Sequence, residues 1–345
     1  KIKRIMKIVS IIIPHYNGKK LLYNCINSIY QNIDIDNFEI IVVDNASTDN
    51  SIKNIQNLFS DVIVVSNKKN IGYSGGCNIG AQHAKGKYLI FLNNDTEHSD
   101  RWIEKLVDFL EEHPSAFAAQ PKVLNINNKE YFDYAGGAGG FIDCFGFPYV
   151  KGRLFNTLEK DAGQYDKPSE IFWSSGAAMI VRADIFNQLS GFDEVYFAYM
   201  EEIDLCWRAQ ALGYKIWSVP SAFIYHYGKQ TIKENTIKSH YLNHRNSWIL
   251  FFKNSFTFNY GILILKRLIL DWMALIYSVF TLDIRRFIAI LYAELWILFS
   301  VSKIIKIRKS NDIAELDNIY NKSIAIDYFI KGKKYFSQID DNNSL

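Results

Sequence analysis

Residues 87–95 read KYLIFLNND, a run of apolar residues that ends in three polar ones. Three earlier runs are of the same kind: KIVSIII at 7–13, FEIIVVD at 38–44 and DVIVVSN at 61–67. A strand that is buried on both faces has apolar residues at nearly every position. The segments between these runs, such as 19–32, have apolar residues at helical spacing. Strands that alternate with helices predict an α/β fold of Rossmann-like type, with a mostly parallel sheet and helices on both faces.

Two of these runs end in an aspartate, Asp44 and Asp95. In open α/β sheets ligands bind beyond the carboxyl ends of the strands, so both carboxylates are candidates for a ligand site. Asp95 offers an oxygen ligand to a divalent cation, with Asn93 as a neutral contact beside it. Asp44 can accept a hydrogen bond from the imide N–H of uracil or thymine. Because Asn and Asp also end strands by forming turns, neither residue decides the question alone.

Three further segments carry residues that suit a site. The glycine-bearing segment 72–80, GYSGGCNIG, would let backbone N–H groups approach a sugar or a phosphate, although a tight turn explains it equally well. Residues 201–204 read EEID, and crowded carboxylates raise one another's pKa, which suits a general base; an acidic first helical turn is the structural alternative. His226 stands alone in an apolar strand, where a histidine is more often a packing residue than a ligand.

Composition excludes several classes of protein. The net charge of +3 is too small for a general nucleic-acid binder. The four cysteines form no CxxC pair, so neither a zinc site nor a redox motif is indicated. The apolar run at 7–13 stops at Pro14 and is too short for a spanning helix or a signal sequence, so we expect a cytoplasmic location.

The composition changes after about residue 245, which predicts a catalytic domain at 1–245 and a helical region at 246–345. Residues 246–309 hold nine Lys or Arg against three Asp or Glu, a local balance of +6. Such a basic, amphipathic segment can lie on an anionic membrane surface, and a helical hairpin packed on the main domain or on a second subunit is the alternative. The Gly-rich, aromatic stretch 125–168 predicts a long loop or short hairpins at the rim of a site.

Together these segments resemble the family 2 glycosyltransferases of the GT-A fold, in particular their rhamnosyltransferase-like bacterial members. The resemblance covers residues 7–245. It rests on five segments in this order: SIIIPHYNG, IVVDNASTDNS, NKKNIGYSGGCNIGAQHAKGKYLIFLNND, SSGAAMIVRADIF and GFDEVYFAYMEEIDLCWRAQALGY.

The resemblance implies an inverting transfer of a sugar from a nucleotide diphosphate to an acceptor hydroxyl, with Mg²⁺ or Mn²⁺ as cofactor. It implies that Asp95 and His226 bind the metal. It places the catalytic base at Glu202, where the family usually has Asp, with Glu201 as the rival. The residues that it implies in binding the nucleotide-sugar donor are Pro14, Tyr16, Asn17, Asp44, Asn70, Gly72, Gly75, Gly76, Asn78, Asn93 and Asn94.

The resemblance also suggests substrates. GYSGGCNIG resembles a GFAGGNN-type segment of rhamnosyltransferases, so dTDP-L-rhamnose is the expected donor, and a UDP-sugar is the alternative. A lipid-linked or growing cell-surface saccharide as acceptor would suit a protein that lies at the inner face of the cell membrane; a homodimer is the other use of the C-terminal helices. One rival function is a sugar nucleotidyltransferase. That class usually has a Gly-rich signature with Arg or Lys near its N-terminus, and the segment PHYNGKK does not match it. The other rival is a catalytically inactive relative that binds a sugar nucleotide.

Overall fold

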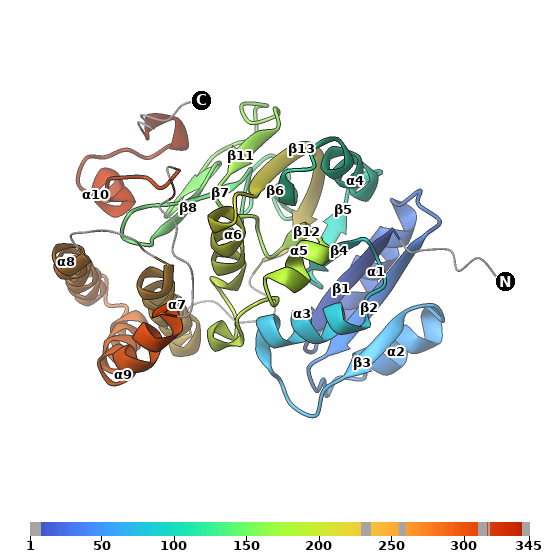
Figure 1. Ribbon diagram of the computed structural model, residues 1–345, viewed down its shortest axis with the longest axis horizontal. Helices are drawn as coiled ribbons and strands as arrows, with labels where there is room; N and C mark the ends of the chain where they lie inside the picture. The colour runs from blue at the N-terminus through green and yellow to red at the C-terminus, as the bar shows by residue number, and fades with distance from the viewer. Residues whose placement is uncertain (1–7, 229–235, 255–259, 310–315, 317, 340–345) are drawn as a thin grey trace.

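The computed structural model describes residues 8–228, 236–254, 260–309, 316 and 318–339, and predictions that fall on other residues lie outside this range. A central sheet organises the molecule, and a smaller sheet and a group of helices lie beside it (Figure 1). The strands are β1 (Val9–His15), β2 (Phe38–Asp44), β3 (Ile63–Ser66), β4 (Tyr88–Leu92), β5 (Thr96–His98), β6 (Ala116–Asn125), β7 (Gly140–Ile142), β8 (Pro148–Val150), β9 (Arg153–Leu154), β10 (Thr157–Leu158), β11 (Ser169–Ile171), β12 (Ala178–Arg182) and β13 (Lys215–His226). The helices are α1 (Lys19–Gln31), α2 (Ser51–Leu58), α3 (Gly72–His83), α4 (Trp102–Glu112), α5 (Ala183–Gln188), α6 (Glu201–Ala211), α7 (Ile237–Asn254), α8 (Tyr260–Phe280), α9 (Ile284–Lys309) and α10 (Ile324–Phe329), with short 3-10 turns at Glu194–Tyr196 and Phe336–Gln338.

The central sheet has the strand order β11-β13-β6-β12-β4-β1-β2-β3, and β5 pairs with β13. The predicted parallel arrangement holds for β4, β1, β2 and β3, which are parallel neighbours in that order. Beyond β4 the sheet is mixed: β12 is antiparallel to both β4 and β6, while β13 is parallel to β6. Antiparallel strands added to a parallel sheet are common in large α/β folds.

Both faces of the sheet are covered by helices, as the apolar runs predict. In β1, Ile11 and Ile13 pack in one buried cluster with residues of α1 and α4. Ile12, between them, packs in the other cluster, which contains residues of α3, α5, α6 and α7. Successive side chains of a strand point to opposite faces, so a strand covered on both sides must be apolar throughout.

The stretch 125–168 contains short strands rather than a single long loop. Strands β7 to β10 form a second sheet of four short antiparallel strands. Figure 1 shows this sheet beside α6, on the side of the central sheet away from β1, β2 and β3. The short hairpins that the Gly-rich composition indicates are therefore present.

The C-terminal region is helical in its described part. Helix α7 packs against α9, and its residues Trp248 and Ile249 belong to the same buried cluster as Ile12 of the central sheet. The predicted division between residues 245 and 246 therefore falls inside a helix that packs on the main body. The division remains a prediction. Within the described residues, no helix combines the length and the apolar composition that crossing a membrane requires.

Candidate active site

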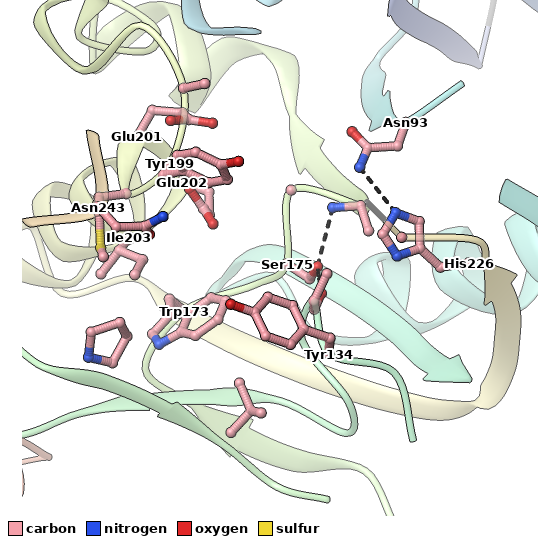
Figure 2. Close-up of a pocket in the computed structure, with 18 of the residues that line it drawn as sticks. Asn93, Tyr134, Trp173, Ser175, Tyr199, Glu201, Glu202, Ile203, His226 and Asn243 are labelled. Atoms are coloured by element: carbon pink, nitrogen blue, oxygen red, sulfur yellow. Dashed lines mark hydrogen bonds between the residues drawn. The ribbon is translucent and has the colours of Figure 1, made fainter. Parts of the chain in front are cut away.

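A cavity of about 380 Å³, here called the main cavity, lies between the ends of β4 and β13, the start of α6 and the small sheet. Figure 2 shows Asn93 and His226 on one side of it, Glu201 and Glu202 on the other, and aromatic side chains along the wall between them. The first group, which also contains Asp95, is called the Asp95 end. The pair Glu201 and Glu202 is called the glutamate end.

At the Asp95 end, residues from distant parts of the chain meet. Asp95 follows β4 and is 3% exposed, and its Oδ1 lies 3.2 Å from Nε2 of His226, the last residue of β13. The other ring nitrogen, Nδ1, lies 2.8 Å from Oδ1 of Asp133, and Nδ2 of Asn93 lies 3.3 Å from Nε2. The structure therefore brings together the two residues that the resemblance implies as metal ligands.

The geometry of His226 suits a cation. When Nδ1 carries the proton and donates it to Asp133, the lone pair of Nε2 faces Oδ1 of Asp95. Two lone pairs at this separation repel unless a positive charge lies between them. Burial lowers the pKa of His226, but the carboxylates of Asp95 and Asp133 outweigh burial and raise it to about 10. Without another cation, a proton occupies this position.

A divalent ion fits the same position. The buried Oδ1 of Asp95 has no partner besides Nε2 of His226 within the described residues, and Asp95 lines the cavity. No group of three or more His, Cys, Asp or Glu side chains with metal-binding geometry occurs in the part of the chain that the structure describes. With Asp95 and His226 as its protein ligands, such an ion would take its remaining ligands from substrate and water oxygens.

The glutamate end is organised differently. Glu201 is 4% exposed, and Glu201 and Glu202 each have an Oε2 atom without a hydrogen-bond partner in the described chain. Burial, reinforced by the neighbouring Glu202, raises the pKa of Glu201 well above its usual value. Burial also raises the pKa of Glu202, to about 7. A carboxyl with a pKa near neutrality can accept a proton efficiently at physiological pH.

The third carboxylate of the EEID segment, Asp204, has a structural role. Its carboxylate lies 2.8 Å from Nε of Arg208 and 2.9 Å from Nζ of Lys253, which also pairs with Asp193. Burial raises the pKa of Asp204, but Arg208 and Lys253 overcome burial and lower it to about 2. Asp204 therefore joins α6 to α7 through a buried ion cluster, and the two glutamates alone among the three line the main cavity.

The loop before α6 has an unusual backbone. Phe197, Tyr199 and Met200 have φ angles of 65°, 71° and 75°, which are unfavourable for residues with a side chain and cost about 1–3 kcal/mol each. Asn246 of α7 donates hydrogen bonds from Nδ2 to three carbonyl oxygens within 196–199, at 3.0, 2.8 and 2.8 Å. Helix α7 therefore holds the loop that places the glutamate end.

The residues implied in nucleoside binding lie together at the ends of β1 and β2. The backbone amide of Ser47 donates to Oδ1 of Asp44 at 2.8 Å, and the amide of Thr48 donates to Oδ1 of Asn17 at 2.8 Å. Pro14 lies in β1, and Tyr16 is 38% exposed. Asp44 therefore makes the turn-forming contact that is the structural alternative to a ligand-binding role. Its role in base recognition, with those of Pro14, Tyr16 and Asn17, remains a prediction.

The glycine-bearing segment forms the start of α3. Gly72 has φ +81° and its amide donates to Oδ1 of Asn70, while the next two amides donate to the carbonyl oxygen of Phe197. A Cβ on Gly76 would lie 3.1 Å from Cβ of Pro14, and one on Gly75 would lie 3.0 Å from Ile71. Close packing of α3 explains these glycines, and their part in donor binding remains a prediction.

Two predicted asparagines make contacts within the protein. The side chain of Asn78 donates to the carbonyl oxygen of Phe192 at 2.9 Å and accepts from the amide of the same residue at 2.9 Å. Nδ2 of Asn94 lies 2.7 Å from Nδ1 of the buried His15. Both residues fix loops near the cavity but neither lines it, so their assignment to the donor site also remains a prediction.

Sequence reasoning did not single out several residues of the cavity wall. Asp133, which bonds His226, and Tyr134, Arg153 and Trp173, which line the cavity, come from the stretch 125–168 or its border. The guanidinium of Arg153 lies 3.3 Å from the centre of the Tyr134 ring. The available signal was the abundance of glycine and aromatic residues, which marks the segment as a rim without selecting residues within it.

The fold is that of the GT-A glycosyltransferases. It is similar to GalNAc-T7 solved with UDP, GalNAc and Mn²⁺, with a TM-score of 0.59 and 20% identity, covering 75% of this chain and 49% of that one. It is also similar to the mannosyltransferase PcManGT of Pyrobaculum calidifontis solved with GDP-Man and Mn²⁺, with a TM-score of 0.51 and 14% identity, covering 85% of this chain and 75% of that one. Residues 10–189 match the family described as "Glycosyl transferase family 2", and the chain belongs to this family.

The chain is also similar in sequence to rhamnosyltransferases and other glycosyltransferases of bacteria. The chain is 25% identical over 225 residues to an N-acetylglucosaminyl-diphospho-decaprenol L-rhamnosyltransferase of Mycobacterium tuberculosis, covering 61% of this chain and 73% of that one. It is 28% identical over 218 residues to rhamnosyltransferase WbbL of Escherichia coli, covering 61% and 78%. An uncharacterized glycosyltransferase of Haemophilus influenzae is 35% identical over 122 residues, covering 34% of this chain and 38% of that one. The matched family segment ends just after α5, so Glu201, Glu202 and His226 lie beyond it.

Proposed function

We propose that this chain is an inverting, divalent-metal-dependent glycosyltransferase that moves L-rhamnose from dTDP-L-rhamnose to an acceptor hydroxyl during cell-surface polysaccharide synthesis. The observation that carries the proposal is one cavity with a cation position at one end and two carboxyls of raised pKa at the other. Two rhamnosyltransferase relatives support the choice of sugar. A UDP-sugar carrying galactofuranose, glucose, galactose or N-acetylhexosamine is the alternative donor.

Glu202 is the general base in this proposal. Its carboxylate removes the proton from the acceptor hydroxyl while the oxygen attacks the anomeric carbon, and the bond from that carbon to the diphosphate breaks on the opposite face. The proton ends on Glu202, whose Oε2 has no hydrogen-bond partner in the described chain. Glu201 is the rival, because burial and the neighbouring Glu202 raise its pKa well above the usual value as well. The family resemblance, which places the base at the second acidic position, favours Glu202 over Glu201.

Asp95 and His226 would hold Mg²⁺ or Mn²⁺, with Asn93 as a neutral neighbour. Asp133 orients the His226 ring by accepting from Nδ1, so that Nε2 faces the metal position. When bound, the ion supplies positive charge that stabilises the departing diphosphate. Pro14, Tyr16, Asn17 and Asp44 surround the nucleoside, and Asp44 accepts the imide N–H of thymine. Asn70, Gly72, Gly75, Gly76, Asn78 and Asn94 complete the donor side.

The C-terminal helices support contact with a membrane surface. Large apolar side chains that are more than half exposed recur along α8 at helical spacing: Ile262, Leu265, Ile269, Trp272, Ile276, Val279 and Phe280. Helix α9 adds exposed apolar residues of the same kind: Ile284, Tyr292, Leu298 and Phe299. Contiguous exposed apolar surface marks an interaction site, and the local charge of +6 favours an anionic lipid surface. The chain therefore lies peripherally at the inner face of the cell membrane in this proposal.

Vesicle sedimentation tests the membrane contact. Trp272→Asp should reduce pelleting with vesicles that contain phosphatidylglycerol, because it places a charge at the exposed apolar face. The matched control is Leu58→Asp, at a position that is 55% exposed on α2, and it should pellet like the wild type. A wild-type protein that forms a dimer in solution and does not pellet would assign the face to a homodimer instead.

A thermal-shift screen with nucleotide sugars tests the function. A ligand that binds the folded state raises the melting temperature by mass action, so dTDP-L-rhamnose with Mn²⁺ should stabilise the protein most. Transfer of rhamnose to an acceptor would then be measured with the same donor. If a UDP-sugar stabilises the protein most, the donor is that UDP-sugar and not dTDP-L-rhamnose. Stabilisation without turnover would indicate a catalytically inactive relative.

A further inference from the structure

A second cavity of about 350 Å³ adjoins the main cavity, and is here called the side chamber. It lies between α7, α8, α10 and the small sheet. Its lining is largely apolar and includes Phe147, Leu270, Ala274, Ala325, Ile326 and Phe329. Pro148, Phe155, Met200 and Asn243 line both cavities, so the side chamber and the main cavity share one wall, and Met200 immediately precedes Glu201.

The side chamber opens at the exposed apolar face of α8. Met273, Tyr277 and Phe329 line the chamber and are themselves 43%, 42% and 48% exposed. Met273 and Tyr277 each follow a residue of the exposed apolar face, Trp272 and Ile276. The chamber therefore has exposed apolar residues in its lining next to the apolar face of α8, where an apolar chain that leaves a membrane surface could enter.

One cation, Arg286, lines the chamber among the residues that the structure describes. Arg286 lines it, and its buried Nε has no hydrogen-bond partner among the described residues. Asp271 also lines it; one of its carboxylate oxygens pairs with Nε of Arg267 at 3.4 Å, and the other, the buried Oδ1, has no hydrogen-bond partner among the described residues. Burial, together with the charge of Arg286, lowers the pKa of His244 to about 3, so this third group is neutral. A guanidinium is well suited to bind a phosphate oxygen.

We propose that the side chamber binds the apolar chain of a lipid-linked acceptor, with Arg286 beside the phosphate that joins this chain to the saccharide. The saccharide then passes the shared wall and presents its hydroxyl to Glu202 in the main cavity. This inference rests on the proposed transferase function and adds a binding site for the apolar chain of the acceptor. The largely apolar lining suits such a chain better than a free, fully hydrophilic saccharide.

Binding of farnesyl phosphate to the full-length protein, measured by calorimetry, tests the chamber. Ala274→Trp on α8 and Ala325→Trp on α10 fill it from two different elements. Each should weaken farnesyl phosphate binding at least tenfold, while stabilisation by dTDP-L-rhamnose with Mn²⁺ stays unchanged. Leu265→Trp, on the same helix but outside the chamber lining, is the control and should bind farnesyl phosphate like the wild type.

The role of Arg286 is tested separately. Arg286→Met should weaken binding of farnesyl phosphate but leave binding of uncharged farnesol unchanged, and Arg285→Met should change neither. A wild-type protein that does not bind farnesyl phosphate, or two chamber variants that bind it like the wild type, would overturn the proposal. A protein that binds farnesyl phosphate in the chamber but is stabilised by no nucleotide sugar would instead overturn the transferase function and keep the lipid site.

Discussion

The Asp95 end and the glutamate end of the main cavity both contain buried carboxyl groups, but hold them in opposite ways. At the Asp95 end, His226 lies between two carboxylates at 2.8 and 3.2 Å and carries a positive charge when no other cation is present. At the glutamate end, the two Oε2 atoms have no partner within the described residues, and burial favours the neutral acids. The partners of each carboxyl, rather than its type, decide whether it holds a cation or moves a proton.

Removing the charge of Asp95 should have the largest effect. Asp95→Asn keeps the size of the side chain but takes away the anionic ligand, so kcat/KM should fall about 10³-fold, as when a main electrostatic contact to a transition state is lost. Initial rates with dTDP-L-rhamnose over a range of Mn²⁺ concentrations measure this. Asp100→Asn, a nearby exposed position, is the control. An Asp95→Asn enzyme with unchanged rate and unchanged metal dependence would rule out the metal site.

The glutamate pair should separate into a base and a supporting acid. Glu202→Gln should lower kcat by about 10²-fold with little change in the KM for the donor, because a general base acts in the chemical step. Glu201→Gln should lower kcat by about tenfold. Since the base must be ionised, wild-type kcat should fall as the pH drops through about 7. A larger loss of kcat in Glu201→Gln than in Glu202→Gln would assign the base to Glu201.

Asp133 should affect metal binding more than chemistry. Asp133→Asn weakens the bond that orients His226, so the affinity for Mn²⁺ should fall by about 10–100-fold, and the rate should recover at high metal concentration. A metal titration of the activity measures both quantities. Asp184→Asn, an exposed position on α5, is the matched control. Equal loss of rate at every metal concentration would show that Asp133 acts in some other way.

The smallest effect concerns stability and pH. The pKa of Glu202 is higher in the folded protein than in the unfolded chain, so the folded state loses stability as the pH rises from about 4 to about 7 and this carboxyl ionises. Glu202→Gln should therefore be more stable than the wild type at pH 8, on the order of 1–3 kcal/mol, and gain nothing at pH 4. Asp204→Asn, in the same turn, should instead be less stable at pH 8, because it breaks the ion cluster with Lys253. Thermal melting at both pH values measures these changes, and a Glu202→Gln gain at pH 4 would contradict the explanation.

The first four strands could be predicted because β1, β2 and β4 are buried on both faces, and because β3, half-buried at the edge of the sheet, is also a continuous apolar run. The position of Asp95 followed from the same pattern. Its meeting with His226 could be expected only from the family resemblance, since no local pattern relates residues so far apart. Asp133 was missed because a polar residue in a Gly-rich segment belongs to no periodic pattern. Helix α3 has four glycines, yet it is helical because close packing against Pro14 and Ile12 outweighs their low helix propensity.

In the EEID segment, residue spacing predicts the helical turn but not which of the carboxylates line the cavity. Helical periodicity places Glu201, Glu202 and Asp204 in one turn, but it does not reveal that Arg208 and Lys253 take Asp204 away from the cavity. Those partners come from the next turn and from α7. The pKa of each carboxyl therefore depended on tertiary contacts that the sequence alone does not contain.

The bonds from Asn246 to the loop at 196–199 limit how this enzyme can be recombined with its relatives. A chimera joined between residues 245 and 246 would combine the loop of one parent with the α7 of another. Both halves could fold while Glu201 and Glu202 lose their positions. A junction after Asn254, where α7 ends, keeps the loop and its support from the same parent. Exchange of acceptor specificity by swapping C-terminal segments should therefore begin beyond α7.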